Sequence, residues 1–121
     1  MDSISLKKKL SKFDVHWSPK LIGELNGQYV KLAKGVGELV WHAHAEEDEF
    51  FLVLAGRLHP HFRDRVTILN PGECCIVPRG VEHKPVAEGE VQVLLFEPKS
   101  TRYTGDHDGE QTVAVDDQDW I

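Results

Sequence analysis

Three histidines and one glutamate are the residues of this chain best suited to chemistry. His42 and His44 are separated by one alanine, and Glu49 follows after four further residues. Because successive side chains of a β-strand point to opposite faces, we expect His42 and His44 to project from the same face. Two imidazoles and a carboxylate form part of a ligand shell for a first-row divalent ion. His83, 39 residues beyond His44, can supply a fourth ligand if the sheet closes into a barrel.

The composition predicts one domain without a nucleic-acid or membrane partner. The chain has 121 residues, of which 40% are hydrophobic, and a formal net charge of −6. This charge argues against binding to a phosphate backbone, which favours a clustered positive surface. No apolar run approaches the roughly 20 residues that a membrane helix needs. The basic N-terminal residues are not followed by the apolar block of a signal peptide. We therefore expect a cytoplasmic protein whose single domain occupies residues 1–121.

The two cysteines, Cys74 and Cys75, are neighbours in the sequence. Neighbouring side chains of a strand point apart, so a disulfide between them would be strained. Two thiols without a disulfide framework fit a reducing compartment. We interpret both as small hydrophobic residues, at least one of them buried, and a role as metal ligand is the alternative.

The hydrophobic pattern predicts a short helix followed by many short strands. Leu6, Leu10 and Phe13 lie at helical spacing within residues 4–13. After Pro19, segments rich in Val, Leu, Ile and Phe recur every eight to twelve residues, which predicts an antiparallel sandwich or barrel. The predicted strands are 20–25, 28–34, 38–44, 48–55, 57–62, 65–69, 74–77, 82–87, 91–97 and 111–115.

Turn residues separate several of these strands. Asn26-Gly27 predicts a hairpin turn, and Gly56 predicts a turn after the apolar run that precedes it. Pro60 within a predicted strand indicates a sheet edge or a bulge. In the acidic last stretch, residues 112–115 could add an edge strand, and Trp120 with Ile121 could dock in an apolar groove.

The segment around the first three candidate ligands resembles the first motif of the cupin superfamily. His42-Ala-His44, four residues, Glu49, six residues and Gly56 match that motif. Its leading glycine does not match, because Gly37 leaves four residues before His42 where the motif has five.

The second cupin motif is also present. Gly72, five residues, Pro78-Arg-Gly80, two residues and His83 match it, whereas Ala87 replaces its final asparagine. The chain is similar to the small single-domain members of the RmlC-like cupin superfamily, those grouped near mannose-6-phosphate isomerase-like proteins. Neither departure from the motifs removes a metal ligand.

This resemblance implies an all-β fold, the cupin-type double-stranded β-helix or jelly-roll barrel, here with a short N-terminal helix. The barrel core would span about 28–97, with N- and C-terminal extensions. The resemblance also implies one divalent metal ion, Zn, Fe, Mn or Ni, bound by His42, His44, Glu49 and His83. A cupin that keeps the fold without the metal is the alternative.

Other side chains near the motifs are weaker candidates. The motif spacing favours Glu49 over the three acidic residues before it, which we interpret as a solvated loop at the barrel mouth: Glu46, Glu47 and Asp48. His59 and His61 share a strand face but flank Pro60 and lack a following carboxylate, so a surface or edge position is the simpler interpretation. We expect His16 and His107 to be exposed in turns.

Alternation from the ligands predicts a partly apolar pocket. Phe51 and Val53 share the face of Glu49, and Val40 shares the face of the two neighbouring histidines. Phe50, Leu52 and Leu54 would point to the opposite face. The candidates for polar lining, each with a surface position as the alternative, are Tyr29, Lys31, Gln92 and Arg79.

Residues 50–54 are apolar on both faces of the predicted strand, whereas a strand covered on one side alternates more cleanly. An isologous homodimer would bury the second face, and a two-sheet core without a partner is the alternative.

Two hypotheses of function remain open for a metal-binding chain. The first is an enzyme acting on a small sugar-like or keto-acid metabolite, by isomerisation or epimerisation, or by oxygen-dependent cleavage with iron. Its metal would be the electrophile, and Glu49 would be a ligand that can release to act as a catalytic base. The second is a module that binds or senses a small molecule or a metal without turnover.

Overall fold

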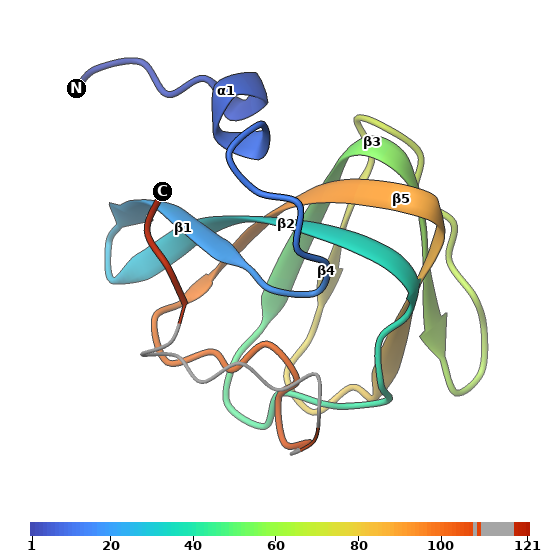
Figure 1. The fold of residues 1–121 in the computed structure, drawn as a ribbon. Helices are drawn as coiled ribbons and strands as arrows, with labels where there is room; N and C mark the ends of the chain where they lie inside the picture. Colours follow the sequence, from blue (N-terminus) through green and yellow to red (C-terminus); the bar gives the residue numbers. More distant parts are fainter. Residues whose placement is uncertain (108, 110–117) are drawn as a thin grey trace.

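Three long strands dominate the fold. The computed structural model describes residues 1–107, 109 and 118–121. Its elements in chain order are α1 (Leu6–Leu10), β1 (Lys20–Leu25), β2 (Gln28–Glu38), β3 (Glu49–Phe62), β4 (Cys74–Val77) and β5 (His83–Pro98). The strands form one antiparallel sheet in the order β1-β2-β5-β3-β4, and this sheet curls around an interior (Figure 1). The prediction of an all-β fold with a short N-terminal helix is confirmed.

Bulges let the long strands bend without ending. The register between β2 and β5 shifts between Gly35 and Gly37, and the register between β3 and β5 shifts on both sides of Ala55. The predicted turn at Gly56 is wrong, because β3 continues through it and joins the predicted strands 48–55 and 57–62. Gly56 has φ +77, and a Cβ there would lie 2.3 Å from the carbonyl oxygen of Glu90. A glycine is required where the bent strand approaches its neighbour so closely.

Other predicted strands differ in extent. Predicted strands 82–87 and 91–97 are both parts of β5. Residues 38–44 do not form a strand, since β2 ends at Glu38 and only His42 makes a bridge to His83. Residues 65–69 contribute single bridges at Val66 and Leu69. The predicted strand 111–115 lies outside the described residues.

The N-terminal helix is shorter than the predicted residues 4–13. The Ser5 side chain caps its start by accepting a hydrogen bond from the Lys8 backbone, 3.2 Å away, and Ser11 ends it. Phe13 follows the helix but still joins an outer apolar cluster with Leu10. The buried members of this outer cluster are Leu10, Phe13, Ile22 and Leu32. The helix therefore packs against the outer side of the sheet through Leu10, and Figure 1 shows it above β1 and β2.

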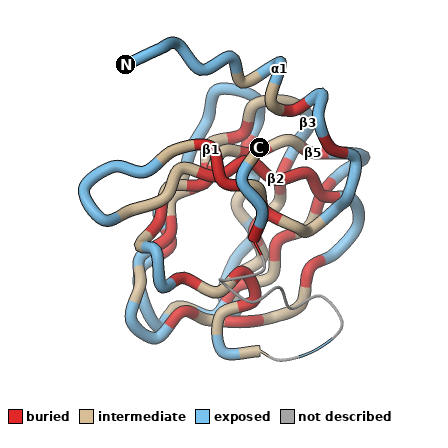
Figure 2. Tube along the Cα trace, turned by 60° about the vertical axis from the view of Figure 1, so that its left-hand side comes forward, coloured by how far each residue is buried: buried red, intermediate tan, exposed pale blue. Residues whose placement is uncertain are grey.

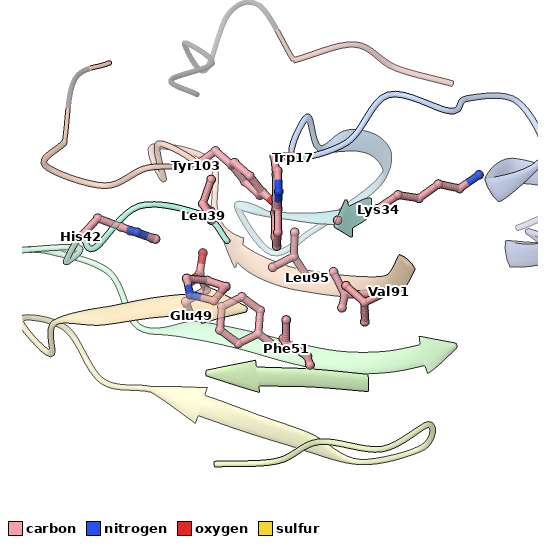
Figure 3. A pocket seen from close by; sticks show the side chains of 13 residues that line it. Trp17, Lys34, Leu39, His42, Glu49, Phe51, Val91, Leu95 and Tyr103 are labelled. Atoms are coloured by element: carbon pink, nitrogen blue, oxygen red, sulfur yellow. The ribbon is translucent and has the colours of Figure 1, made fainter. Parts of the chain in front are cut away.

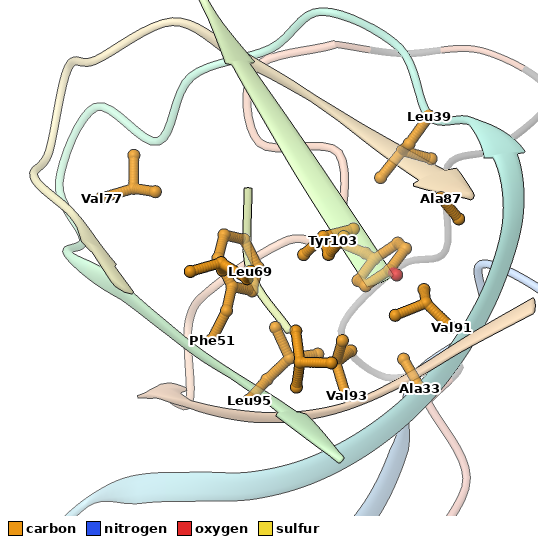
Figure 4. Packing of buried hydrophobic residues seen from close by; sticks show 12 residues of the cluster. Ala33, Leu39, Phe51, Leu69, Val77, Ala87, Val91, Val93, Leu95 and Tyr103 are labelled. Atoms are coloured by element: carbon orange, nitrogen blue, oxygen red, sulfur yellow. The ribbon is translucent and has the colours of Figure 1, made fainter. Parts of the chain in front are cut away.

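The main core lies inside the curled sheet. Buried and half-buried residues alternate along β3 and β5, so that Phe51 and Val53 face the interior while Phe50, Leu52 and Leu54 face outward. Figure 2 shows buried segments along the curled strands and exposed segments at the connecting loops. The inner cluster draws on β2, β3, β4, β5, the connecting loops and the segment around Tyr103 (Figure 4). Its buried members are Ala33, Leu39, Phe51, Val53, Leu58, Leu69, Val77, Ala87, Val91, Val93, Leu95 and Tyr103.

Two terminal features complete the fold. Trp120 is 55% exposed and meets the Tyr29 ring edge-on at 5.6 Å, while Ile121 packs against the outer cluster.

Cys74 is exposed and Cys75 half-buried, and both are free thiols. Among the described residues, none of the helices has the length and apolar character that crossing a bilayer requires.

Candidate metal centre

His42 and His83 face each other across a short antiparallel bridge. The backbone N–H of each donates to the carbonyl oxygen of the other, at 3.0 and 2.9 Å. Residues opposed in this way place their side chains on the same side of a sheet, and the two imidazole centroids are 4.3 Å apart. Gly80 supports this bridge from the turn before His83, because the Gly80 N–H donates to the His44 carbonyl oxygen at 2.8 Å.

The loop that carries His42 and His44 is held from the outside by residues 105 and 106. The Ala43 N–H donates to a side-chain oxygen of Asp106 at 3.0 Å, and the Asp106 N–H donates to the Ala43 carbonyl oxygen at 3.0 Å. Gly105 has φ +54, and a Cβ there would lie 2.1 Å from the Ala43 carbonyl oxygen. Only glycine permits this approach, so the loop position depends on a segment about sixty residues further along the chain.

The four candidate ligands converge on one point. His42, His44, Glu49 and His83 are all buried, and one ligand atom from each lies within 4.8 Å of the others. The Nε2 atoms of His44 and His83 are each 3.4 Å from a Glu49 carboxylate oxygen. Nitrogen and oxygen ligands about 2.1 Å from a shared ion are about 3.4 Å apart at a tetrahedral angle. The spacing therefore fits a single divalent ion, whereas a direct hydrogen bond would be shorter.

The tautomers also fit a metal. Nδ1 of His42 lies 2.8 Å from the Val40 carbonyl oxygen, and Nδ1 of His83 lies 2.9 Å from that of Val81. A carbonyl oxygen can only accept, so each Nδ1 carries the proton and each Nε2 has a free lone pair directed at the centre. The Nε2 atoms of His44 and His83 are buried without a hydrogen-bond partner. Buried polar nitrogens without partners are costly, and an ion would satisfy them.

The charges at the centre are those of a ligand set. Burial, followed by the charge of His83, lowers the pKa of His42 to about 4, so His42 is neutral at pH 7. Burial opposes ionisation of Glu49, but its contacts with His44 and His83 outweigh burial and hold its pKa well below the usual range. Burial likewise lowers the pKa of His44, but its close contact with the Glu49 carboxylate outweighs burial and raises that pKa. Glu49 is therefore the anion of the centre.

A second carboxyl group lies against Glu49. Glu97 is fully buried on β5, and its Oε1 is 2.8 Å from Nζ of Lys31, also fully buried, on β2. Burial, together with the charge and hydrogen bonding of Glu49, raises the pKa of Glu97 well above the usual range although Lys31 opposes this shift. Burial and these two carboxyl groups also raise the pKa of Tyr103. The carboxylate of the centre is thus backed by a second carboxyl group with a raised pKa, which in turn contacts Lys31.

A narrow cavity extends from His42 and Glu49 into the barrel (Figure 3). The space open to the centre of a water molecule is about 20 Å³, enough for one ordered water. Its walls are mainly apolar, with the Tyr103 ring and the Trp17 indole on one side and Phe51 on the other (Figure 3). The side chain of Lys34 reaches away from the cavity to donate to the Phe13 carbonyl oxygen at 2.7 Å.

The structure brings together the four candidate ligands but only part of the predicted pocket. Phe51 lines the cavity, and Val53 is buried in the inner core beside it. Val40 is half-buried and Leu39 lines the cavity instead, since residues 38–44 are not a regular strand and do not keep its alternation. Gln92 lies with α1 on the outer face of the sheet.

The predicted polar lining residues also lie outside the cavity. Tyr29 packs against Trp120, and Lys31 is fully buried in its pair with Glu97. Arg79 is exposed, with its backbone N–H and its guanidinium near Asp48. Among the other histidines, His16 is exposed and pairs with Glu90 at 2.8 Å, His59 is half-buried and pairs with Glu88 at 2.9 Å, and His61 and His107 are half-buried.

Sequence reasoning missed three side chains at the centre. Glu97, Tyr103 and Trp17 belong to no motif, and each reaches the cavity or Glu49 only through the tertiary fold. One signal was available for Glu97. It falls on the inward-facing positions of β5 with Val93 and Leu95, where an acidic residue is out of place unless it has a buried partner.

Comparisons with known proteins agree with this geometry. The Cupin domain family matches residues 28–97. The Bacillus subtilis (strain 168) protein YdbB is 39% identical over 98 residues, which are 80% of this chain and 79% of that protein. The crystal structure of a cupin-2 domain containing protein from Shewanella frigidimarina has a TM-score of 0.78 and 46% identity, covering 78% of this chain and 93% of the other.

A further solved structure supports the same fold. Protein NMB1881 from Neisseria meningitidis has a TM-score of 0.73 and 28% identity, covering 80% of this chain and 99% of that one. The match of the family spans the three long strands and all four candidate ligands. The chain therefore belongs to the cupin family, as a small single-domain member with a His, His, Glu, His cluster compatible with metal binding.

Proposed function

We propose that this protein is a metal-dependent enzyme acting on a small metabolite with a carbonyl or carboxylate group. The observation that carries the proposal is the buried convergence of His42, His44, Glu49 and His83 within 4.8 Å, with imidazole nitrogens that have no other partner. A divalent ion in such a site supplies Lewis acidity toward a carbonyl oxygen or a bound water. Three imidazoles and one carboxylate leave coordination positions for a guest, as in catalytic rather than closed structural sites.

The chain's own residues would bind and orient the substrate and keep water away from it. His42 and His83 are fixed by their carbonyl contacts to Val40 and Val81, so their lone pairs are preorganised. The apolar walls of the cavity exclude water from the guest. We propose that Glu49 is both a ligand and the group that accepts a proton from the substrate, in isomerisation or epimerisation, or in oxygen-dependent cleavage if the ion is iron.

Elemental analysis of protein purified without an affinity tag tests the metal assignment. We expect about one equivalent of Zn, Fe, Mn or Ni, and loss of that metal in His83→Ala. His59→Ala is the matched control, because His59 pairs with Glu88 away from the centre. Retention of the full metal content in His83→Ala would contradict the assignment. Turnover of a keto-acid and sugar panel that disappears in Glu49→Gln would support its catalytic role.

The second candidate function is a module that binds a small molecule without turnover. The small volume of the cavity and its few polar groups favour this alternative over a sugar-processing enzyme. The same panel separates the two: saturable binding without product by the metal-loaded protein supports the module.

We also propose a homodimer in the cytoplasm. A row of apolar side chains crosses the outer face of the sheet, and its members are direct cross-strand neighbours: Val30, Phe96, Phe50 and Ile76. Ile76 is 65% exposed, and a second copy would cover this row. The free thiols support a reducing compartment. Light scattering of the wild-type protein and of Ile76→Glu tests the dimer, and a monomeric wild-type mass would refute it.

A further inference from the structure

Trp17 differs from the other residues around the cavity. It reaches the cavity from the segment before β1, and it is half-buried, whereas the other twelve lining residues are all buried. Trp17 is therefore the lining residue that is most accessible to solvent. Figure 3 shows this ring beside Tyr103 and above Leu95.

The local structure holds this ring in place. The Trp17 backbone N–H donates to the Lys34 carbonyl oxygen at 2.7 Å, and its indole Nε1–H donates to the Val36 carbonyl oxygen at 2.9 Å. Trp17 has φ +54, a conformation that is costly for a residue with a large side chain. The ring lies on Gly35, where a Cβ would come within 2.6 Å of it. The two hydrogen bonds, the positive φ and the packing on Gly35 together fix the position of the Trp17 ring at the cavity.

The charge of the centre and the apolar walls of the cavity determine which kind of ligand can bind. A divalent ion with Glu49 as the only anionic ligand keeps a net positive charge, which favours an anionic oxygen as the head of the guest. Beyond the centre the walls are apolar and offer a chain no hydrogen-bonding partner except near Tyr103: Leu39, Phe51, Leu58, Val91, Val93 and Leu95. A guest with many hydroxyl groups would leave them unpaired, at a cost.

We infer that the site takes short carboxylates with an apolar tail, and that Trp17 is the residue that limits the length of the tail. The inference rests on the proposed metal centre and names the class of its ligand. The space of about 20 Å³ holds about one water molecule, so it leaves almost no room for a tail behind the head group while the ring is in place. A longer tail enters only when the indole is displaced or replaced by a smaller side chain.

The test uses the Zn²⁺-loaded protein and the straight-chain carboxylates from acetate to octanoate, with binding measured by calorimetry. In the wild type we expect affinity to stop rising after the shortest members. In the series Trp17→Phe, Trp17→Leu and Trp17→Ala the rise should continue to progressively longer chains, by about fourfold per methylene. Trp120→Leu is the matched control, because Trp120 lies against Tyr29 and outside the cavity.

A fluorescence readout is independent of the calorimetry. With Trp41 and Trp120 replaced by phenylalanine, Trp17 is the only tryptophan left, and a short carboxylate should shift its emission. The graded series retains a partial wall in Trp17→Phe, so the test does not depend on Trp17→Ala folding.

The outcomes separate the two proposals. If the wild-type protein binds no stoichiometric Zn²⁺, the metal centre itself is refuted. If Zn²⁺ binds but no carboxylate does, or the length limit is the same in the wild type and in Trp17→Leu, this inference is overturned and the metal centre stands. A limit that moves with the size of residue 17 supports it.

Discussion

Replacing Glu97 by glutamine should destabilise the protein far less than replacing it by alanine, although Glu97 is paired with a buried lysine. In an ordinary buried ion pair, removing either charge is strongly destabilising. Here burial and the Glu49 carboxylate raise the pKa of Glu97 well above its usual range, so we predict that Glu97 keeps its proton in the native protein. An amide has nearly the same shape, can donate toward Glu49 and can accept from Lys31.

The magnitudes follow from the complete burial of Glu97 and Lys31. Glu97→Ala leaves the Lys31 ammonium buried without a partner, which costs about 3–5 kcal/mol. Glu97→Gln keeps both contacts and should cost about 1 kcal/mol or less. A domain of this size is stable by only about 5–15 kcal/mol, so the alanine variant loses a large part of its stability.

The assay is urea unfolding followed by circular dichroism, with metal removed by a chelator. For a slope of about 2 kcal/mol per molar urea, Glu97→Ala lowers the midpoint by about 2 M and Glu97→Gln by about 0.5 M or less. Zn²⁺ competition gives a second measurement, in which Glu97→Ala weakens binding about 10- to 100-fold because Glu49 loses its support. Glu88→Gln and Glu88→Ala are the matched controls, since Glu88 is an exposed partner of Arg57 and His59.

The pH dependence of the unfolding free energy tests the raised pKa of Glu97 independently. Because the folded-state pKa of Glu97 is raised, the native protein keeps a proton that the unfolded chain has released above pH about 4.5. This group therefore makes wild-type stability fall as the pH rises from that value toward the folded-state pKa, and Glu97→Gln removes the slope. If glutamine is as damaging as alanine, Glu97 is ionised in the native state and the reasoning is wrong.

Three further predictions concern the fold and the centre. Leu58→Ala should cost about 2–5 kcal/mol in urea unfolding, because this side chain is 2% exposed in the inner core. Gly56→Ala should destabilise far more than Gly72→Ala, since both have positive φ but only Gly56 would place a Cβ 2.3 Å from a carbonyl oxygen; equal losses would rule out the clash. The pKa of His42 falls from 6.5 to about 4 in the native protein. The metal-free protein should therefore lose about 3 kcal/mol of unfolding free energy as the pH drops through that range, because only the unfolded chain takes up the proton. In urea unfolding at several pH values, His42→Phe should abolish this loss.

Local pattern was enough for the inward and outward faces of β3 and for the ligand types. Alternation placed Phe51 and Val53 inward and Phe50, Leu52 and Leu54 outward, because the period of two is a property of the strand itself. The hairpin at Asn26-Gly27 also follows from its own residues, which take φ +51 and +76 between β1 and β2.

Local pattern failed where backbone geometry depends on a neighbouring strand. A glycine after an apolar run is typical of a turn, but Gly56 lies in a bulge, because β3 bends around the core while it remains paired with β5. Residues 38–44 look like a strand, yet they form a loop held by Asp106 and Gly80. Neither outcome is visible in a window of ten residues, since the deciding contacts come from distant segments.

By itself the sequence determined which residue types could hold an ion and that His42, His44, Glu49 and His83 occur at cupin spacing. The tertiary structure alone decided what surrounds them. Lys31 and Glu97 meet only because β2 pairs with β5, and Trp17 and Tyr103 reach the cavity only because the chain ends fold back over the barrel. The physical reason is that a ligand motif is defined by the number of residues between neighbouring ligands, which the sequence contains. Desolvation, charge balance and the walls of a cavity instead arise from contacts between residues far apart in the chain.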